Sequence, residues 1–197
     1  MATISHVQCT CPKCGRSFDG QCPTVVNAAE NPELREKVLD GSIFLAECPV
    51  CGTSVLIRQP FLFMDPAAKL VLLMTDANVD DSGLDRSMTA RKVSTPGELI
   101  EKLKLFDAGL DDVTMELCKY VTLQELGKDV DLKFLRMDGA DNEIILTYPE
   151  NGQMEMLAIG FNVYEDCRGI VSRNPALREA ATGLASVDSE WISRFIG

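Results

Sequence analysis

The chain has 197 residues, 46% of them hydrophobic, and a formal net charge of −11 at pH 7. This length allows one large or two small domains with apolar cores of their own. Residues 96–197 carry 19 acidic and 10 basic side chains, whereas residues 1–95 carry 11 and 9. A surface this acidic repels phosphate backbones, and no cluster of Lys and Arg with interleaved aromatic residues offsets it, so nucleic acid is disfavoured as a partner.

The hydropathy pattern predicts a cytoplasmic protein with no membrane partner. The first residues, MATISHVQCTCPKCG, lack the charged start and the apolar run of a signal peptide. The longest apolar run, LVLLM at 70–74, is too short to cross a bilayer. Thiols stay reduced in the cytoplasm, so closely spaced cysteines there more often bind metal or take part in chemistry than form disulfides.

The first predicted strand, ISHVQCTC, leads into the motif CPKCG at 11–15, and a second motif, CPVCG, follows at 48–52. A gap of two residues lets two thiolates bind one tetrahedral ion, and two such pairs complete a shell of four. The proline presets the turn, and the final glycine permits the positive φ with which backbone N–H groups turn toward the sulfurs. The spacing therefore predicts one structural zinc ion bound by Cys11, Cys14, Cys48 and Cys51.

Redox or disulfide chemistry and a catalytic metal are the alternatives for these motifs. A redox Cys-x-x-Cys normally stands alone and opens a helix after a strand. Both motifs here precede strand-like segments instead, RSFDG and TSVLIRQPF. A catalytic metal needs an open coordination position, which four thiolates do not leave. Structural zinc is the preferred interpretation.

The other cysteines and the single histidine are not expected to be metal ligands in the preferred interpretation. Cys9 is expected to pack beside the site, with replacement of Cys11 as a ligand, or a place next to the ligands, as the alternatives. Cysteines with apolar neighbours are expected in cores: Cys22, Cys118 and Cys167. His6 is the only histidine, which removes most Cys–His and Ser–His–Asp schemes and every metal site with several histidines.

Residues 1–75 are predicted to form a zinc ribbon with a helical insertion. The helix is expected over NPELREKVLDG, with Asn31 as N-cap, Pro32 at the first position and Gly41 after the end. Strands are expected on both sides of the second motif, over SIFLAE and TSVLIRQPFLFM. The segment DPAAKLVLLM adds a turn and a strand, and the polar residues 76–94 are predicted to be an exposed loop or linker.

Residues 95–197 are predicted to form an acidic α+β domain, which makes the fold class of the whole chain α+β. TPGELIEKLKLFDAG starts a helix with a capping box of Thr95 and Glu98, and the helical period resumes until Gly127. VDLKFLRM, NEIILTY and MEMLAIGFNVY follow the strand period, and the turns DGAD and PENG between them predict an antiparallel β-meander. NPALREAATGL and DSEWISRFI predict two closing helices, with Trp191 packed on Phe195.

Residues 9–75 resemble the CpXC domain, a bacterial and archaeal family named for its paired Cys-Pro-x-Cys motifs. The resemblance rests on CPKCG, the Asn-Pro-x-Leu-Arg-Glu helix ending in VLDG, CPVCG and PFLFMDP, and LKLFDAGLDD continues it less closely. It implies a zinc-binding pair of turns and supplies no activity. The family pattern has an aromatic-His-Asp string where this chain has Phe63, Met64 and Asp65, so no ligand or proton-transfer role is expected there.

The sequence predicts that the protein is not an enzyme. It contains none of the motifs GxGxxG, GxxxxGK[ST], G-x-S-x-G and HExxH, and its acidic pairs, such as Asp111 with Asp112, are adjacent residues whose side chains diverge. The preferred hypothesis is a non-catalytic structural-zinc protein that binds another protein. The alternatives are a thiol or zinc redox sensor, suggested by the spare Cys9, and a small-molecule enzyme whose site no motif reveals. The oligomeric state stays open.

Overall fold

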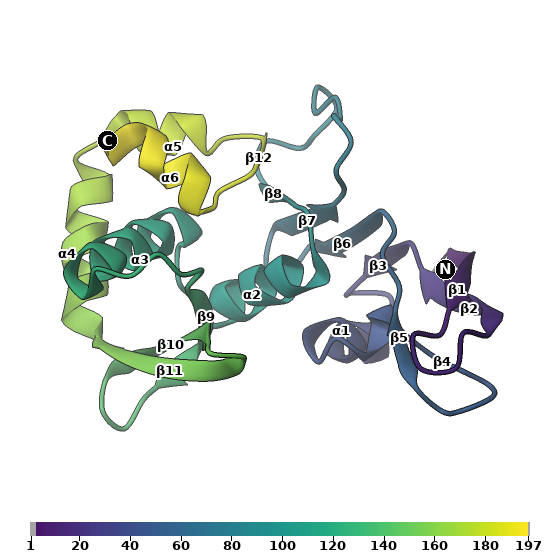
Figure 1. Cartoon of the computed structure of the whole chain (residues 1–197). Helices are drawn as coiled ribbons and strands as arrows, with labels where there is room; N and C mark the ends of the chain where they lie inside the picture. Colours follow the sequence, from purple (N-terminus) through teal and green to yellow (C-terminus); the bar gives the residue numbers. More distant parts are fainter. Residues whose placement is uncertain (1–2, 197) are drawn as a thin grey trace. The chain divides into compact units, whose positions relative to one another are not determined.

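The computed structural model describes residues 3–196 and divides the chain into two compact units, Met1–Ile100 and Glu101–Gly197 (Figure 1). We call them the N-terminal unit and the C-terminal unit. Within the described residues, six α-helices combine with several antiparallel strand pairs, which confirms the predicted α+β class. No helix in residues 3–196 has the length and apolar character needed to span a membrane.

Two β-hairpins in the N-terminal unit each have a cysteine motif as their turn. Strand β1 (Ile4–Thr10) pairs antiparallel with β2 (Ser17–Pro23), and CPKCG lies between them. Strand β4 (Leu45–Glu47) pairs antiparallel with β5 (Ser54–Leu56), and CPVCG lies between those two. The chain thus places both motifs at hairpin tips, as the flanking strand-like segments indicated.

The segment between the hairpins contains the predicted helix. It consists of β3 (Val25–Asn27), α1 (Pro32–Leu39) and a 3₁₀ turn, η1 (Ser42–Phe44). Asn31 occupies the N-cap position without a side-chain capping bond, and Gly41 follows the helix with a φ of 82°. The strand predicted over SIFLAE starts only at Leu45, because Ser42–Phe44 continue the turn that leaves the helix.

A mixed sheet forms the core of the N-terminal unit. It combines β3 with β6 (Phe61–Asp65), β7 (Leu70–Met74) and β8 (Thr89–Val93), and within the N-terminal unit these strands lie in the order β8, β7, β6, β3. The pair β6–β7 is antiparallel, whereas β3–β6 and β7–β8 are parallel. Residues 76–94, expected to be a loop or linker, therefore contain a strand. The segment TARKV has too few apolar residues to show a strand period, and pairing with the buried β7 orders it.

Aromatic packing joins the hairpin region to this sheet. Phe44 and Phe61 are both 1% exposed, and their ring centroids lie 5.0 Å apart in an edge-to-face arrangement. Beneath the hairpins, a Cβ atom on Gly20 would lie 2.8 Å from the Cys9 sulfur and 3.1 Å from Ile57. The two hairpins therefore pack closely enough that only glycine fits at this position.

The C-terminal unit combines helices with one antiparallel sheet. The preceding helix α2 (Pro96–Asp107) runs into it, and its further helices are α3 (Asp112–Leu126), α4 (Phe161–Ser172), α5 (Pro175–Ala180) and α6 (Ser189–Ile196). The sheet consists of β9 (Lys133–Asp138), β10 (Glu143–Glu150) and β11 (Gln153–Gly160), paired in chain order, and a short β12 (Leu184–Ala185) follows α5. The predicted packing of Trp191 on Phe195 is confirmed, with ring centroids 4.9 Å apart.

The sequence analysis assigned a strand to residues that form the start of a helix, α4 (Phe161–Ser172). The strand predicted over MEMLAIGFNVY ends at Gly160, and Phe161 starts α4, which follows β11 directly (Figure 1). Three of its residues are buried at helical spacing, namely Tyr164, Cys167 and Val171. The strand period therefore stops at Gly160, and the following residues already show the helical period.

Five charged side chains of α2 and α3 are buried in the C-terminal unit, and we call them the charge network. Its members are each 5% exposed or less: Glu101, Lys102, Asp112, Glu116 and Lys119. The Lys119 ammonium contacts Glu101 and lies 2.9 Å from Glu116, while the Lys102 ammonium lies 3.0 Å from Asp112 and 3.5 Å from Glu116. Burial lowers the pKa of Lys119, but the carboxylates of Glu116 and Glu101 outweigh this and raise it above its usual value.

Candidate metal centre

The structure brings the four cysteines of the two motifs together. Their Sγ atoms all lie within 4.8 Å of one another, and they are the sulfurs of Cys11, Cys14, Cys48 and Cys51. Cys11 and Cys48 are 1% exposed, Cys51 is half-buried and Cys14 is exposed. The first cysteine of each motif therefore faces the interior, and the second lies nearer the solvent.

The two turns share one pattern of backbone hydrogen bonds. Gly15 N–H donates to the Cys11 carbonyl, and Gly52 N–H donates to the Cys48 carbonyl, both at 2.9 Å. Cys11 N–H and Cys48 N–H in turn donate to the carbonyls of the residues five positions later, also at 2.9 Å. Gly15 and Gly52 have φ values of 69° and 68°, which L-residues rarely adopt. The positive φ that the glycine after each cysteine pair was expected to permit is therefore present in both turns.

Hydrogen bonds from these turns favour the thiolate forms of Cys11, Cys14 and Cys51. The backbone N–H of Cys14 lowers the pKa of Cys11. The side chain of Thr53, whose Oγ1 lies 3.3 Å from the Cys51 sulfur, and then its N–H, lower the pKa of Cys51 to about 6. At Cys14 the backbone N–H of Arg16 favours the thiolate, yet desolvation and the neighbouring sulfurs raise the pKa to about 11. Four negative charges this close repel one another, so full ionisation of the group requires a cation.

The sulfur positions fit a tetrahedral ion. Zn–S bonds of about 2.3 Å place the corners of a tetrahedron about 3.8 Å apart. The sulfurs of Cys11 and Cys51 are 3.5 Å apart, and those of Cys14 and Cys48 are 3.7 Å apart. All eight cysteines are free thiols. Each of these short contacts joins one cysteine from each motif, so an ion held here would link the two hairpins.

The remaining cysteines and His6 lie outside this group of four. Cys9 is 6% exposed, and its thiol donates to the Val7 carbonyl at 3.5 Å. The His6 ring contacts the Asp19 carboxylate at 2.7 Å on the surface of the β1–β2 hairpin. The cysteines expected in cores are buried, namely Cys22 in the N-terminal unit and Cys118 and Cys167 in the C-terminal unit. Thr53, whose side chain contacts the Cys51 sulfur, was not singled out by the sequence analysis, although it directly follows the second motif.

The position of the family's aromatic-His-Asp string has a structural role in this chain. Asp65 is 8% exposed and accepts a hydrogen bond from Ala68 N–H at 3.1 Å, which closes the turn between β6 and β7. Its carboxylate also lies 3.4 Å from the Arg35 guanidinium of α1. Met64 is partly exposed on the same strand. Nothing in these contacts points to a ligand at this position.

Comparison with known proteins finds a family match over the part of the chain that contains the candidate metal centre. A family model described as "CpXC protein" matches residues 9–119, which is more than half of the sequence. Comparisons with curated proteins and with solved structures found no match. The matched range contains both cysteine motifs and extends through α2 into α3, so it also includes the five residues of the charge network. The chain belongs to the CpXC family.

Proposed function

We propose that this protein binds one zinc ion through Cys11, Cys14, Cys48 and Cys51, and that the ion has a structural role. The observation that supports this most directly is the group of four sulfurs at tetrahedral spacing on the tips of two hairpins. In this proposal the two hairpins form a zinc ribbon, and the segment with α1 is its helical insertion. Four thiolates complete the coordination shell and leave no position for a substrate, so the centre is not catalytic.

Metal analysis of the purified full-length protein tests the zinc proposal. We expect about one zinc per chain, and Cys48→Ser should lower the content to near zero because three thiolates bind zinc much more weakly than four. Cys22→Ser is the matched control, since it changes a buried cysteine outside the group and should keep one zinc. Protein without metal, or with iron as its main metal and the visible absorption of an iron–thiolate centre, would contradict the assignment.

We further propose that the ribbon binds another protein in the cytoplasm. Leu45 and Leu56 are directly opposite each other on β4 and β5, and each is 45% exposed. Val50, at the tip of the same hairpin, is 60% exposed. Apolar side chains gathered on one exposed hairpin are typical of a protein contact surface. Because the hairpin strands have only three residues each, their shape depends on the metal, and so does the proposed surface.

A comparison of variants tests this interaction. The zinc-loaded protein is used to capture partners from an extract of its native host, alongside Leu45→Ser/Leu56→Ser and the control Met154→Ser/Met156→Ser, which changes two exposed methionines of β11. We expect a protein that binds the wild type and the control, and whose purified form binds the leucine variant at least about tenfold more weakly, since two buried leucine contacts are worth over 1.4 kcal/mol. Equal binding to all three forms would contradict the proposal.

A redox sensor is the second candidate, because the Cys14 thiol is exposed and Cys51 is half-buried. Oxidants in solution can reach these two sulfurs, and a disulfide formed between ligands would release the ion. Zinc release under mild hydrogen peroxide, reversed by a thiol reductant, would favour the sensor. Retention of zinc under the same treatment would favour the structural role.

A further inference from the structure

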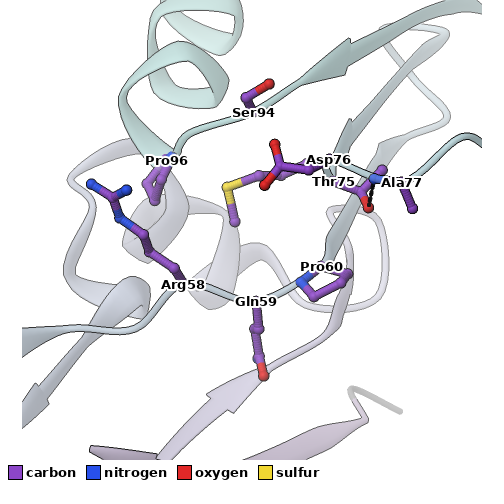
Figure 2. Close-up of a pocket in the computed structure, with 9 residues that line it drawn as sticks. Arg58, Gln59, Pro60, Thr75, Asp76, Ala77, Ser94 and Pro96 are labelled. Atoms are coloured by element: carbon purple, nitrogen blue, oxygen red, sulfur yellow. Dashed lines mark hydrogen bonds between the residues drawn. The ribbon is translucent and has the colours of Figure 1, made fainter. Parts of the chain in front are cut away.

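A pocket of about 330 Å³ lies in the N-terminal unit at the carboxyl ends of β7 and β8 (Figure 2). Three segments line it: residues 58–60 before β6, residues 74–77 at the end of β7, and Ser94 with Pro96 between β8 and α2. The volume falls in the range of small-molecule sites. The cysteine ligands are not among the lining residues, so the pocket is a second candidate site, separate from the metal centre.

The topology of the sheet creates this pocket. Strands β7 and β8 are parallel neighbours, and the Thr75 N–H bonded to the Val93 carbonyl at 2.9 Å holds their ends together. The chain then leaves β7 into the loop 75–88 and leaves β8 into α2, which starts at Pro96. Where two parallel strands send their continuing chains in different directions, a crevice opens outside their carboxyl ends, and such crevices are the usual ligand sites of sheets with parallel strands.

One wall of the pocket is fixed by hydrogen bonds. The Gln59 side chain points away from the pocket in Figure 2, and its amide donates to the carbonyls of Cys22 and Pro23 at 3.2 and 3.4 Å. These two bonds anchor residues 58–60 to the end of β2. Met74, which is 3% exposed, and the rings of Pro60 and Pro96 supply apolar surface. The pocket therefore has a held wall and an apolar lining before any ligand binds.

Two opposite charges line the pocket from different segments. Arg58 comes from the connection between β5 and β6, and Asp76 comes from the loop after β7, with its carboxyl group on the pocket side in Figure 2. Both are exposed, and within residues 3–196 neither side chain has a hydrogen bond or an ion pair. A guanidinium binds a carboxylate with two parallel hydrogen bonds, and a carboxylate binds an ammonium group. Both groups are thus available to a ligand.

We propose that this pocket binds a small zwitterion of the amino-acid type, with its carboxylate on Arg58 and its ammonium group on Asp76. A purely anionic ligand would be repelled by Asp76, and a purely cationic one by Arg58, so a molecule with both charges matches the lining best. The aliphatic part of the ligand would contact Met74 and the two prolines. The proposal concerns binding only, and it is independent of the identity of the metal.

Calorimetric titration of the full-length, zinc-loaded protein tests this inference. The probes are L-alanine, L-methionine and γ-aminobutyrate, which differ in size and charge separation, and the single-charge controls are acetate and ethylammonium. We expect saturable binding of at least one zwitterion and at least about tenfold weaker binding of both controls. Each control lacks one of the two charged groups, and the loss of one hydrogen bond to a charged group lowers affinity by at least about tenfold.

Variants of Arg58 and Asp76 then test whether these two side chains bind the ligand. Arg58→Met and Asp76→Asn should each weaken the binding of that zwitterion at least about tenfold, and both are exposed substitutions that keep the zinc content. Arg86→Met is the matched control, because Arg86 is paired with Asp81 in the loop 75–88 and does not line the pocket. Three results would overturn the proposal: no saturable binding of any zwitterion, equal binding of acetate or ethylammonium, or unchanged binding in both pocket variants.

Discussion

Cys48→Ser, or removal of the metal by a strong chelator, is expected to unfold the two cysteine hairpins while much of residues 96–197 stays ordered. The proposed ion would hold Cys11 and Cys14 near Cys48 and Cys51 across the 33 residues between Cys14 and Cys48, and closing such a loop costs chain entropy. Strands β4 and β5 have three residues each, too few for a hairpin to be stable by itself.

The size of this effect follows from the weakness of the competing interactions. Binding of structural zinc contributes on the order of 10 kcal/mol in small zinc domains. Apart from the four cysteines of the centre, the hairpin region contributes few buried side chains of its own, chiefly Cys9, Cys22, Phe44, Ala46 and Ile57. The C-terminal unit has a continuous apolar core that includes Leu117, Phe134, Leu146 and Trp191 and contains none of the four cysteines of the centre. Loss of the metal should therefore affect the two units very differently.

Hydrogen exchange on the metal-free protein measures this difference. Amides of β1, β2, β4 and β5 should lose protection, whereas those of α3 and β10 should keep it. Trp191, the only tryptophan, lies in the C-terminal core, so its fluorescence should change little. Cys22→Ser is the control for the cost of a buried serine and should keep all of these elements protected. Equal loss of protection in both halves would show one cooperative domain and contradict the predicted boundaries 1–75 and 95–197, and unchanged protection would show that the metal is dispensable.

Lys119→Met is expected to destabilise the C-terminal unit by about 3–5 kcal/mol. The substitution removes the cation that neutralises Glu101 and Glu116 and leaves two carboxylates buried without their closest positive charge. Glu101 is also the acceptor for Phe134 N–H at 2.7 Å, which ties α2 to β9, so a change in its protonation would weaken that contact too. Methionine fits the volume of the lysine stem, so the effect reports charge and not a cavity.

Urea unfolding followed by Trp191 fluorescence measures this change in the free energy of unfolding. Lys128→Met is the matched control, because the Lys128–Glu150 pair has the same chemistry at 2.8 Å but is about one third exposed on both sides. The control should lose much less stability than Lys119→Met, since solvent screens the charges of an exposed pair. If both variants lost the same amount of stability, burial of the charge network would not matter and this interpretation would be wrong.

The elements that could be predicted from the sequence are those whose signals are local. Each cysteine motif carries its own turn, since the proline and the glycine set the backbone of five consecutive residues. Thr95 and Glu98 form the predicted box, with Glu98 N–H bonded to the Thr95 hydroxyl at 3.2 Å, and Gly127 ends α3 in a left-handed conformation with a φ of 62°. A local signal survives because it depends on neighbouring residues only, wherever the segment lies in the fold.

The four sulfurs of the candidate centre could be predicted for a related reason. Their spacing specifies a tetrahedral set before any tertiary contact is known, and the structure brings all four within 4.8 Å. Thr53 was not singled out, because its role depends on the folded turn, which places its hydroxyl oxygen 3.3 Å from the Cys51 sulfur.

The sequence by itself determined the α+β class, the family and the four-cysteine set, whereas the tertiary structure decided what depends on partners distant in the chain. Strand β8 exists because β7 offers it a parallel edge, and its own residues show no strand period. The pocket between Arg58 and Asp76 exists because two parallel strands end side by side. The charge network is buried because α2 and α3 place three carboxylates and two ammonium groups within contact distance. In each case the stabilising free energy comes from contacts between residues that are far apart in the chain. Patterns among neighbouring residues do not reveal such contacts.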